Sequence, residues 1–454
     1  MSSTGNVTIS PVMAKAVNNV LSTQVPTEFT FTINLTSESD TTYKYTPSFF
    51  IESASITQNF ADDYTDDIRV SFTASPQEYM AIFNHAQDLL ATTIRIYVNQ
   101  QSGQRIYTIP PIVKSYKALL LNQENLYSKH PTGALQPTPN MPIVEQHVAT
   151  RIPVHLQLIE KEAYTLRQQQ FHGIFSNSTV ASAIAAIVDK FEIKQLNFIS
   201  PDNTHSWGNI VIPPAQNIND IFDYIQFTYG VYMKGIEFYY TNNTLYIYPP
   251  YELSPKMPSV VNFYNSPNGS YAGAFSYHSV TGNTIDIVTT DKVETKDLSI
   301  MASENVGGSF SFLRASKLVD GFVGVSDNGV YVSKDASLTV GTPYSRTMVN
   351  NANVDRYQAA TDNIFIQSSK LVKWQASLVS TKWLHAVPDL LIPGHKSTWN
   401  IDDNGVFKKR NGILEAVHYD IKFIRKSMAG PVYSCDAEFR LRVDSDTVNN
   451  ASSG

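Results

Sequence analysis

The densest group of ionisable side chains in the sequence is an acidic run, DDYTDD at residues 62–67. Carboxylates this close together could bind calcium or work as a paired acid and base. The calcium-loop pattern is not met, because Tyr64 stands at the third position and no glycine follows at the sixth. The run lies between two expected strands, so a solvated loop is predicted. A function compatible with that prediction is an acidic loop that lines a channel or meets a basic partner.

Other signatures of catalysis were sought and are missing from the sequence. It contains no GxSxG, no phosphate-binding GxxxxGK, no GxGxxG and no HExxH. The segment GVSDNG at residues 324–329 has one residue too many for a nucleophile elbow and is predicted to be a hairpin turn. The ten histidines never pair at i, i+4, and the single cysteine, Cys435, is predicted to be a buried, inert thiol. We therefore predict a protein that is not an enzyme and holds no cofactor or metal.

Composition and charge further restrict the class of protein to which the chain can belong. The 454 residues suggest about three domains, and 42% apolar against 16% charged residues are ample for buried cores. A net charge of −6 does not suit an electrostatic nucleic-acid binder. The N-terminal sequence lacks the pattern of a signal peptide, and the most apolar helical run, residues 180–188, is too short to span a membrane. Folding in a reducing cytoplasm without membrane insertion is expected.

The elements of the first third are expected to be mostly strands. Residues 1–26 show no sustained period and are predicted to form an arm that is ordered only by contact with something else. Alternation at Phe29, Phe31, Ile33 and Leu35 predicts a half-buried strand. A capping box, SPQE at residues 75–78, predicts a helix whose apolar spacing continues to Leu90. Further strands are expected at residues 49–56, 68–73, 93–98 and 105–109.

The sequence signals for secondary structure are clearest between residues 178 and 250. Ser178 is expected to cap a first helix, and Asn217 a second one that carries Ile221 on its apolar face and stops at Gly230. Between them a short strand, Ile210–Ile212, is expected to break at the two prolines that follow. Two strands around Asn242-Asn243 complete a compact α+β unit.

The flanking regions differ in character. Residues 130–142 hold four prolines and are expected to be an extended linker. A strand is expected at residues 152–159, and residues 261–445 are patterned mostly as strands, with a hairpin turn at residues 403–405. The expected divisions are an arm (1–26), a first domain (27–129), a linker with connecting strands (130–177), an α+β module (178–260), a second domain (261–445) and a flexible tail (446–454).

The order of these elements resembles the baseplate hub proteins of contractile-tailed phages and related injection machines. The resemblance rests on IVIP at residues 210–213, the helix NINDIFDYI at 217–225, YG at 229–230 and TLYI at 244–247. Two later segments agree with it: PDLLIPG at 388–394, and GILEAVHYDI at 412–421 followed by AEFRLR at 437–442. Two departures are the missing glycine in the turn at 242–243 and an extra residue before Pro393-Gly394.

The resemblance implies a mainly β structural protein with two tail-tube-like β-barrel domains, at 27–129 and 261–445, plus the α+β module. It implies a homotrimeric ring in the virion baseplate that joins the sixfold tail tube to the threefold central spike and surrounds the DNA channel. Implied partners are the tube, spike and baseplate wedge proteins and the tape measure protein, with DNA passing without specific binding. In such a ring, Asp62, Asp63, Asp66 and Asp67 would form an acidic ring-facing or lumen-facing loop.

Two alternatives remain open from the sequence. One is a carbohydrate-binding or depolymerising protein of the tail-fibre type, in which some of the 52 aromatic residues would stack on sugars. Against it, the aromatic residues alternate within expected strands and suit a core. The other is a different ring component, such as a tube or tail-completion protein, but a chain of 454 residues favours two barrels over one.

Overall fold

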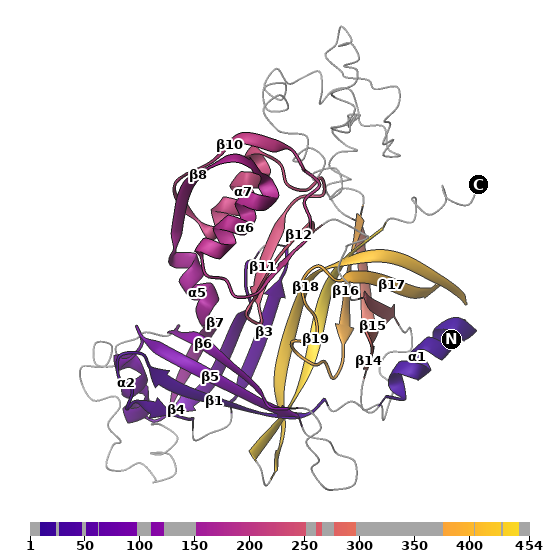
Figure 1. Ribbon diagram of the computed structural model, residues 1–454. Helices are drawn as coiled ribbons and strands as arrows, with labels where there is room; N and C mark the ends of the chain where they lie inside the picture. Colours follow the sequence, from indigo (N-terminus) through magenta and orange to yellow (C-terminus); the bar gives the residue numbers. More distant parts are fainter. Residues whose placement is uncertain are drawn as a thin grey trace, which may run out of the picture.

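The computed structural model describes residues 10–23, 27–47, 51–61, 63–97, 110–121, 151–250, 260–265, 277–296, 376–403, 405–427 and 430–444. Strands dominate these residues, which confirms the mainly β class (Figure 1). Several expectations lie outside them: the linker at 130–142, the turn at 324–329, the strand at 105–109 and the tail at 446–454.

Eight antiparallel strands are paired into a first closed circuit. The pairing order is β18, β3, β4, β7, β6, β5, β1 and β19, and β19 then pairs with β18 again. The strands are β1 (Phe29–Ser37), β3 (Ser53–Asn59), β4 (Asp67–Ala74), β5 (Leu89–Tyr97), β6 (Ile112–Leu120), β7 (Ile152–Glu160), β18 (Val406–Ser427) and β19 (Gly430–Asp444). A short strand, β2 (Lys44–Tyr45), is attached to β1.

A second closed circuit uses six strands. Its order is β13, β17, β18, β19, β16 and β15, and β15 returns to β13 by a parallel pairing. Its other strands are β13 (Val260–Asn265), β15 (Thr284–Lys296), β16 (Ala376–Trp383) and β17 (Lys396–Asp403). A further strand, β14 (His278–Thr281), pairs with β15 outside the circuit.

The two circuits share their longest strands, β18 and β19. One edge of β18 pairs with β17 over residues 406–412 and with β3 over residues 416–421. Glu415 is the extra residue of a bulge between these stretches, and its carbonyl accepts a hydrogen bond from the Phe60 amide at 2.8 Å. Bulges bend and twist a strand. This one lies where β18 passes from one circuit to the other.

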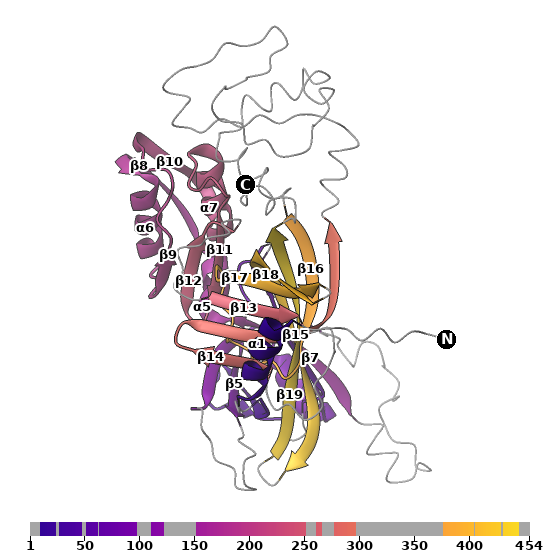
Figure 2. The same ribbon diagram turned by 90° about the vertical axis from the view of Figure 1, so that its right-hand side faces the viewer.

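The N-terminal region differs from the expected arm. Residues 11–21 form α1 (Pro11–Leu21), which packs on β13, β14, β15 and β17 of the same chain (Figure 2). Ser10 caps the helix, and its amide donates to Asp402 at 2.6 Å. Met13, Val17 and Val20 recur at i, i+4 and i+7 and are buried. The expectation that this segment is ordered only by other molecules is therefore wrong for residues 10–23.

The helix expected after residue 75 is shorter than its apolar spacing indicated. The capping box of Ser75 and Glu78 is confirmed, and α2 (Pro76–Asn84) ends well before Leu89. Leu89 and Leu90 instead open β5, in which alternate residues are buried. Two adjacent leucines fit the helical period as well as a strand, and pairing with β1 decides for the strand.

The α+β module spans residues 161–248 in the structure, because α5 and β8, which precede the expected start at 178, pack with its other elements. It rises from the end of β7 (Figure 1). Its elements are α5 (Lys161–Gln168), β8 (Gln170–Thr179), α6 (Val180–Lys190), β9 (Leu196–Phe198), β10 (Ser206–Asn217), α7 (Ile218–Thr228), β11 (Glu237–Thr241) and β12 (Thr244–Tyr248). Thr179, one residue after the expected Ser178, caps α6. The strand at 210–212 does not break at its prolines: β10 runs on through a register shift between Ile212 and Gln216.

Two local predictions in the module are confirmed. The Asn217 side chain accepts from the Asp220 amide at 3.2 Å and so caps α7. Asn242 and Asn243 both have positive φ angles, 53° and 59°, which are those of a tight turn between β11 and β12.

Candidate functional site at a buried polar junction

The acidic run of the sequence lies where the first circuit meets the module. Asp66 is only 2% exposed, and its side chain accepts hydrogen bonds from three others. Gln58 of β3 donates at 3.0 Å, the Tyr239 hydroxyl at 2.9 Å and the Thr241 hydroxyl at 3.0 Å. Burial raises the pKa of Asp66 above its ordinary value. Since Tyr239 and Thr241 belong to β11, their hydrogen bonds to the Asp66 carboxylate connect the module to the first circuit.

Backbone contacts reinforce the same junction. Thr65 and Tyr240 form an isolated parallel bridge, and the Tyr240 amide donates to the Tyr64 carbonyl at 2.7 Å. The Tyr248 hydroxyl donates to the Phe60 carbonyl at 3.1 Å. The loop before β4 is thus joined to the β11–β12 hairpin at a single bridge and, besides the contacts of Asp66, by one side-chain hydrogen bond.

A second buried carboxylate, Glu160 at the end of β7, holds the turn of that hairpin. It is 4% exposed and accepts the backbone amides of Asn242 and Asn243 at 2.9 and 3.3 Å. Burial, together with the nearby charge of Asp66, raises the pKa of Glu160 to about 7. Both amides point at one carboxylate because the two asparagines share the left-handed conformation.

A pH dependence of stability follows from Glu160. In the folded chain Glu160 keeps its carboxyl proton up to a higher pH than an ordinary glutamate, whose pKa is 4.5. The stability contributed by this group therefore rises as the pH falls from about 7 to 4.5. We expect wild type to gain at most about 1.4 kcal/mol of unfolding free energy per pH unit over that window, relative to Glu160→Gln. Urea unfolding at several pH values measures this. Glu162→Gln, at an exposed position, should keep the wild-type slope, and an unchanged slope in Glu160→Gln would contradict the assignment.

A third buried group joins the two circuits. Asp389, in the connection between β16 and β17, forms ion pairs with Arg95 of β5 and with Lys114 of β6 at 2.6 Å. The Arg95 side chain is only 3% exposed. Burial alone would raise the pKa of Asp389, but the charges of Arg95 and Lys114 outweigh it, and the pKa lies below its ordinary value. A loop of the second circuit is thereby held inside the first.

The rest of the acidic run is arranged differently from an open acidic loop. Asp67 accepts from Arg69 at 3.0 Å and from Gln157 at 2.8 Å. The Asp63 amide donates to the Asn59 carbonyl at 3.0 Å, and Asp62 lies outside the described residues. The Asp66 carboxylate is buried and hydrogen-bonded within the junction, so it is not part of an exposed acidic surface. The ring-facing or lumen-facing role remains a prediction for Asp62, Asp63 and Asp67.

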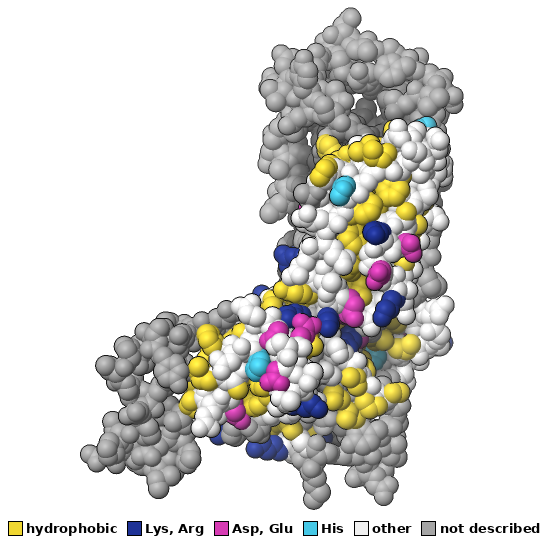
Figure 3. Space-filling model, turned by 60° about the vertical axis from the view of Figure 1, so that its left-hand side comes forward, with side chains coloured by type: hydrophobic (Ala, Val, Ile, Leu, Met, Phe, Trp, Pro, Cys, Tyr) yellow, Lys and Arg dark blue, Asp and Glu magenta, His cyan; other side chains and the backbone are white. Residues whose placement is uncertain are grey.

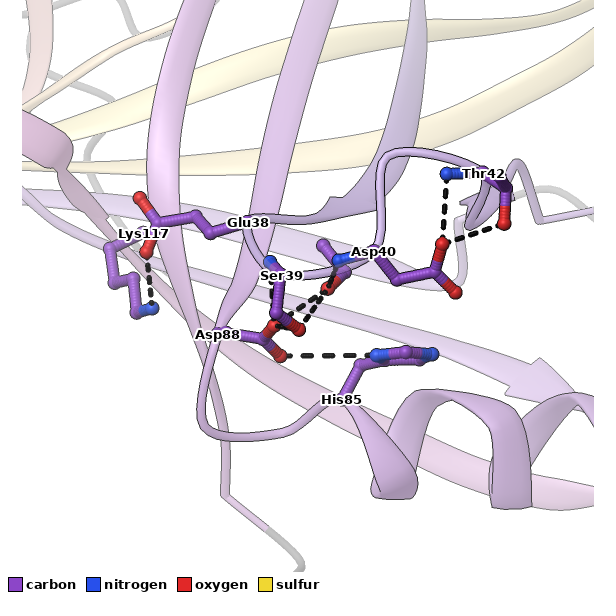
Figure 4. A network of polar contacts seen from close by, with 8 residues as sticks. Glu38, Ser39, Asp40, Thr42, His85, Asp88 and Lys117 are labelled. Atoms are coloured by element: carbon purple, nitrogen blue, oxygen red, sulfur yellow. Dashed lines mark hydrogen bonds and ion pairs between the residues drawn. The ribbon is translucent and has the colours of Figure 1, made fainter.

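A surface network lies beside the junction, at the turn after β1 (Figure 4). Asp88 accepts from Ser37 at 2.6 Å and from the Ser39 amide at 3.0 Å, and these hydrogen bonds lower its pKa. Glu38 pairs with Lys161 of α5 at 2.8 Å and with Lys117 of β6 at 3.4 Å. The network therefore also connects the first circuit to the start of the module.

These groups suit a structural role more than a chemical one. Among the described residues, no three His, Cys, Asp or Glu side chains are placed to hold a metal ion. Cys435 is fully buried and its pKa is raised well above the ordinary value by that burial, as expected for an inert thiol. Glu160 and Asp389 were not predicted from the sequence. Each is an isolated carboxylate without a motif, and only its long-range partners give it a role.

Comparison with known proteins was informative for the middle of the chain. Residues 148–299 match the family model described as the bacteriophage PBS1 gene 109 protein. The chain is similar to a bacteriophage protein family. The matched stretch contains β7, the whole module and β13 to β15. No curated protein matches the chain.

Three solved structures align with most of the chain at low sequence identity. A tail protein from Neisseria meningitidis MC58 is 13% identical, with a TM-score of 0.44, covering 92% of this chain and 97% of that one. The 43 kDa tail protein of prophage MuSo2 from Shewanella oneidensis is 9% identical, with a TM-score of 0.43, covering 91% and 99%. The E. coli c3393 protein, a component of the type VI secretion system, is 7% identical, with a TM-score of 0.41, covering 91% and 77%.

The family match agrees with the resemblance to phage proteins that the sequence indicated. Among the described residues, no helix is both long and apolar enough to cross a membrane.

Proposed function

We propose that the chain is a baseplate hub, a homotrimeric ring that joins a sixfold tail tube to a threefold central spike and surrounds the DNA channel. The observation that carries this proposal is the pair of closed strand circuits within one chain. A tube presents six equivalent surfaces and a spike three. Three copies of a chain with two barrel-like units offer both symmetries with one gene product.

In this proposal each circuit is one tube-like barrel. The first takes most of its strands from the predicted domain at 27–129, β7 from the 130–177 segment and β18 and β19 from the domain at 261–445. That last domain also supplies nearly all of the second circuit, whose β13 begins at Val260. The sharing of β18 and β19 and the ion pairs of Asp389 would keep the two barrels in a fixed relation. A fixed relation is what a ring of alternating barrels needs, because any rotation between them would break the sixfold arrangement.

The partners follow from the same proposal. The chain would bind itself, the tail tube protein, the central spike protein, the baseplate wedge proteins and the tape measure protein, while DNA passes without specific contacts. The net charge of −6 supports passage without adhesion. A sugar-binding role receives less support, since the side chains of Trp383 and Trp399 are fully buried.

The subunit count tests the proposal. Native mass spectrometry of the purified protein, or of hub complexes released from tails, should give three copies per particle. Monomers, dimers or six copies in released complexes would contradict it. An isolated tube component would instead give rings of six copies, so the same spectrum separates the two candidates.

A further inference from the structure

The α+β module is a folded unit of its own. Its sheets, β8–β10 and β11–β12–β9, are separate from the large sheet in the described part of the chain, apart from the bridge between Thr65 and Tyr240. Its helix α6 packs on β8 and β10 and α7 on β10, and Ile221 and Phe222 of α7 are fully buried. In Figure 3 the module stands above the large sheet, and charged side chains gather where the two meet. Such a unit can shift as a body when its contacts with the first circuit break.

The contacts between the module and the first circuit fall into two groups. One lies at α5, which follows β7 directly: Lys161 pairs with Glu38 at 2.8 Å, and the Tyr64 hydroxyl donates to the Ala163 carbonyl at 3.2 Å. The other lies at the β11–β12 hairpin. Because the chain enters the module at α5, the contacts there act at the pivot, and those of the hairpin decide whether the module stays docked.

Two buried carboxylates on the side of the first circuit hold the hairpin. Asp66 accepts hydrogen bonds from side chains of β11, and Glu160 accepts the two backbone amides of the turn at 242–243. Between them the Tyr240 amide donates to the Tyr64 carbonyl at 2.7 Å. The hairpin therefore has three backbone amides that are bonded to the first circuit and that detachment would expose to solvent.

The charges around Glu160 favour its neutral form. Asp66 is a second buried carboxylate near it, and the positive group that interacts with it, Lys114 of β6, is already paired with Asp389 at 2.6 Å. Other titratable groups that interact with Glu160 are tyrosines whose pKa is raised by burial, so that they stay uncharged near pH 7: Tyr116 of β6, Tyr240 of β11 and Tyr246 of β12. An ionised Glu160 in the docked module therefore meets a like charge in a desolvated place.

Docking of the hairpin is consequently linked to a proton. In the docked module, burial and the charge of Asp66 raise the pKa of Glu160 to about 7, whereas the ordinary value is 4.5. The state with the higher pKa is favoured at low pH, so docking weakens as the pH rises from 4.5 to about 7 and changes no further above it. With these two pKa values the docking equilibrium differs about 60-fold between pH 5 and pH 7.5.

We propose that the β11–β12 hairpin is a proton-operated latch between the module and the first circuit. Protonated Glu160 keeps the hairpin docked, whereas ionised Glu160 near Asp66 favours its detachment while the module stays folded. The position of the module would then respond to the pH near neutrality. The inference concerns a single chain and does not depend on the copy number of the proposed ring.

Hydrogen–deuterium exchange at single-amide resolution tests the latch, after the intrinsic pH dependence of exchange is divided out. The reporters are the three amides that detachment exposes, those of Tyr240, Asn242 and Asn243. Amides in the middle of α7 provide the reference, because they stay hydrogen-bonded in a detached but folded module. In wild type we expect the reporters to be less protected than the reference at pH 7.5 and to gain tenfold or more in protection at pH 5, with about 60-fold as the limit.

Three variants assign the effect to its residues. Glu160→Gln is neutral at every pH, so its reporters should show no pH dependence. Glu162→Gln, at an exposed position on α5, should keep the wild-type dependence. Asp66→Asn removes the like charge while its side-chain oxygen can still accept from Gln58 and Tyr239, so the dependence should become smaller than in wild type.

The same measurements show when the latch is wrong. Reporters as protected as the α7 amides at every pH would overturn it, because the hairpin would then open only when the module unfolds. The same pH dependence in wild type and in Glu160→Gln would also overturn it. If Glu160→Gln does not fold, Asp66→Asn decides, and an unchanged dependence in that variant contradicts the proposal.

Discussion

Asp389→Ala is expected to lower the free energy of unfolding by about 3–5 kcal/mol, a large part of the ~5–15 kcal/mol that holds an ordinary domain. The substitution leaves Arg95 and Lys114 charged inside the first circuit without their shared carboxylate. Removing one member of a buried ion pair is costly because the remaining charge stays desolvated. Urea unfolding followed by circular dichroism measures the loss.

An exposed ion pair provides the control for this experiment. Lys422 pairs with Asp420 and Asp436 and is 55% exposed, so Lys422→Ala should cost less than about 1 kcal/mol. If Asp389→Ala lowered the free energy of unfolding as little as Lys422→Ala does, the ion pairs of Asp389 would not be what holds the loop of the second circuit inside the first.

Ile221→Asp is the second change with a large expected effect. Ile221 lies on the buried face of α7 and is fully buried. A carboxylate there would have no partner, and we expect a loss of more than about 3 kcal/mol, seen as insoluble or non-assembling protein. Thr228→Asp, at an exposed position on the same helix, should stay within about 1 kcal/mol of wild type. Normal assembly of Ile221→Asp would mean that this helix face is not part of the core.

Local signals in the sequence were sufficient for two parts of the module, the helix α7 and the turn at Asn242-Asn243. A cap, a three- and four-residue apolar spacing and a glycine stop are all contained within residues 217–230, and they placed α7 correctly. The turn at Asn242-Asn243 is equally local, since two residues that tolerate positive φ stand between two apolar runs.

Elements that depend on distant partners could not be predicted in the same way. β3 pairs with β18 across some 360 residues, so no window of sequence reveals that the first circuit is closed by the C-terminal strands. Asp66 shows the same limit. The acidic run was visible, but its burial depends on Tyr239 and Thr241, far along the chain. The apolar period of α1 was present at Met13, Val17 and Val20 but was obscured by the polar residues around it.

Three chains are proposed to close a ring of six tube-like barrels, two from each chain. A reconstruction of the assembled tail by electron cryomicroscopy, at a resolution that traces β18 and β19, tests it most directly. The predicted result is threefold symmetry, with both strand circuits of each chain facing the channel in alternation. A ring with one barrel per chain, or with a copy number other than three, would contradict the claim.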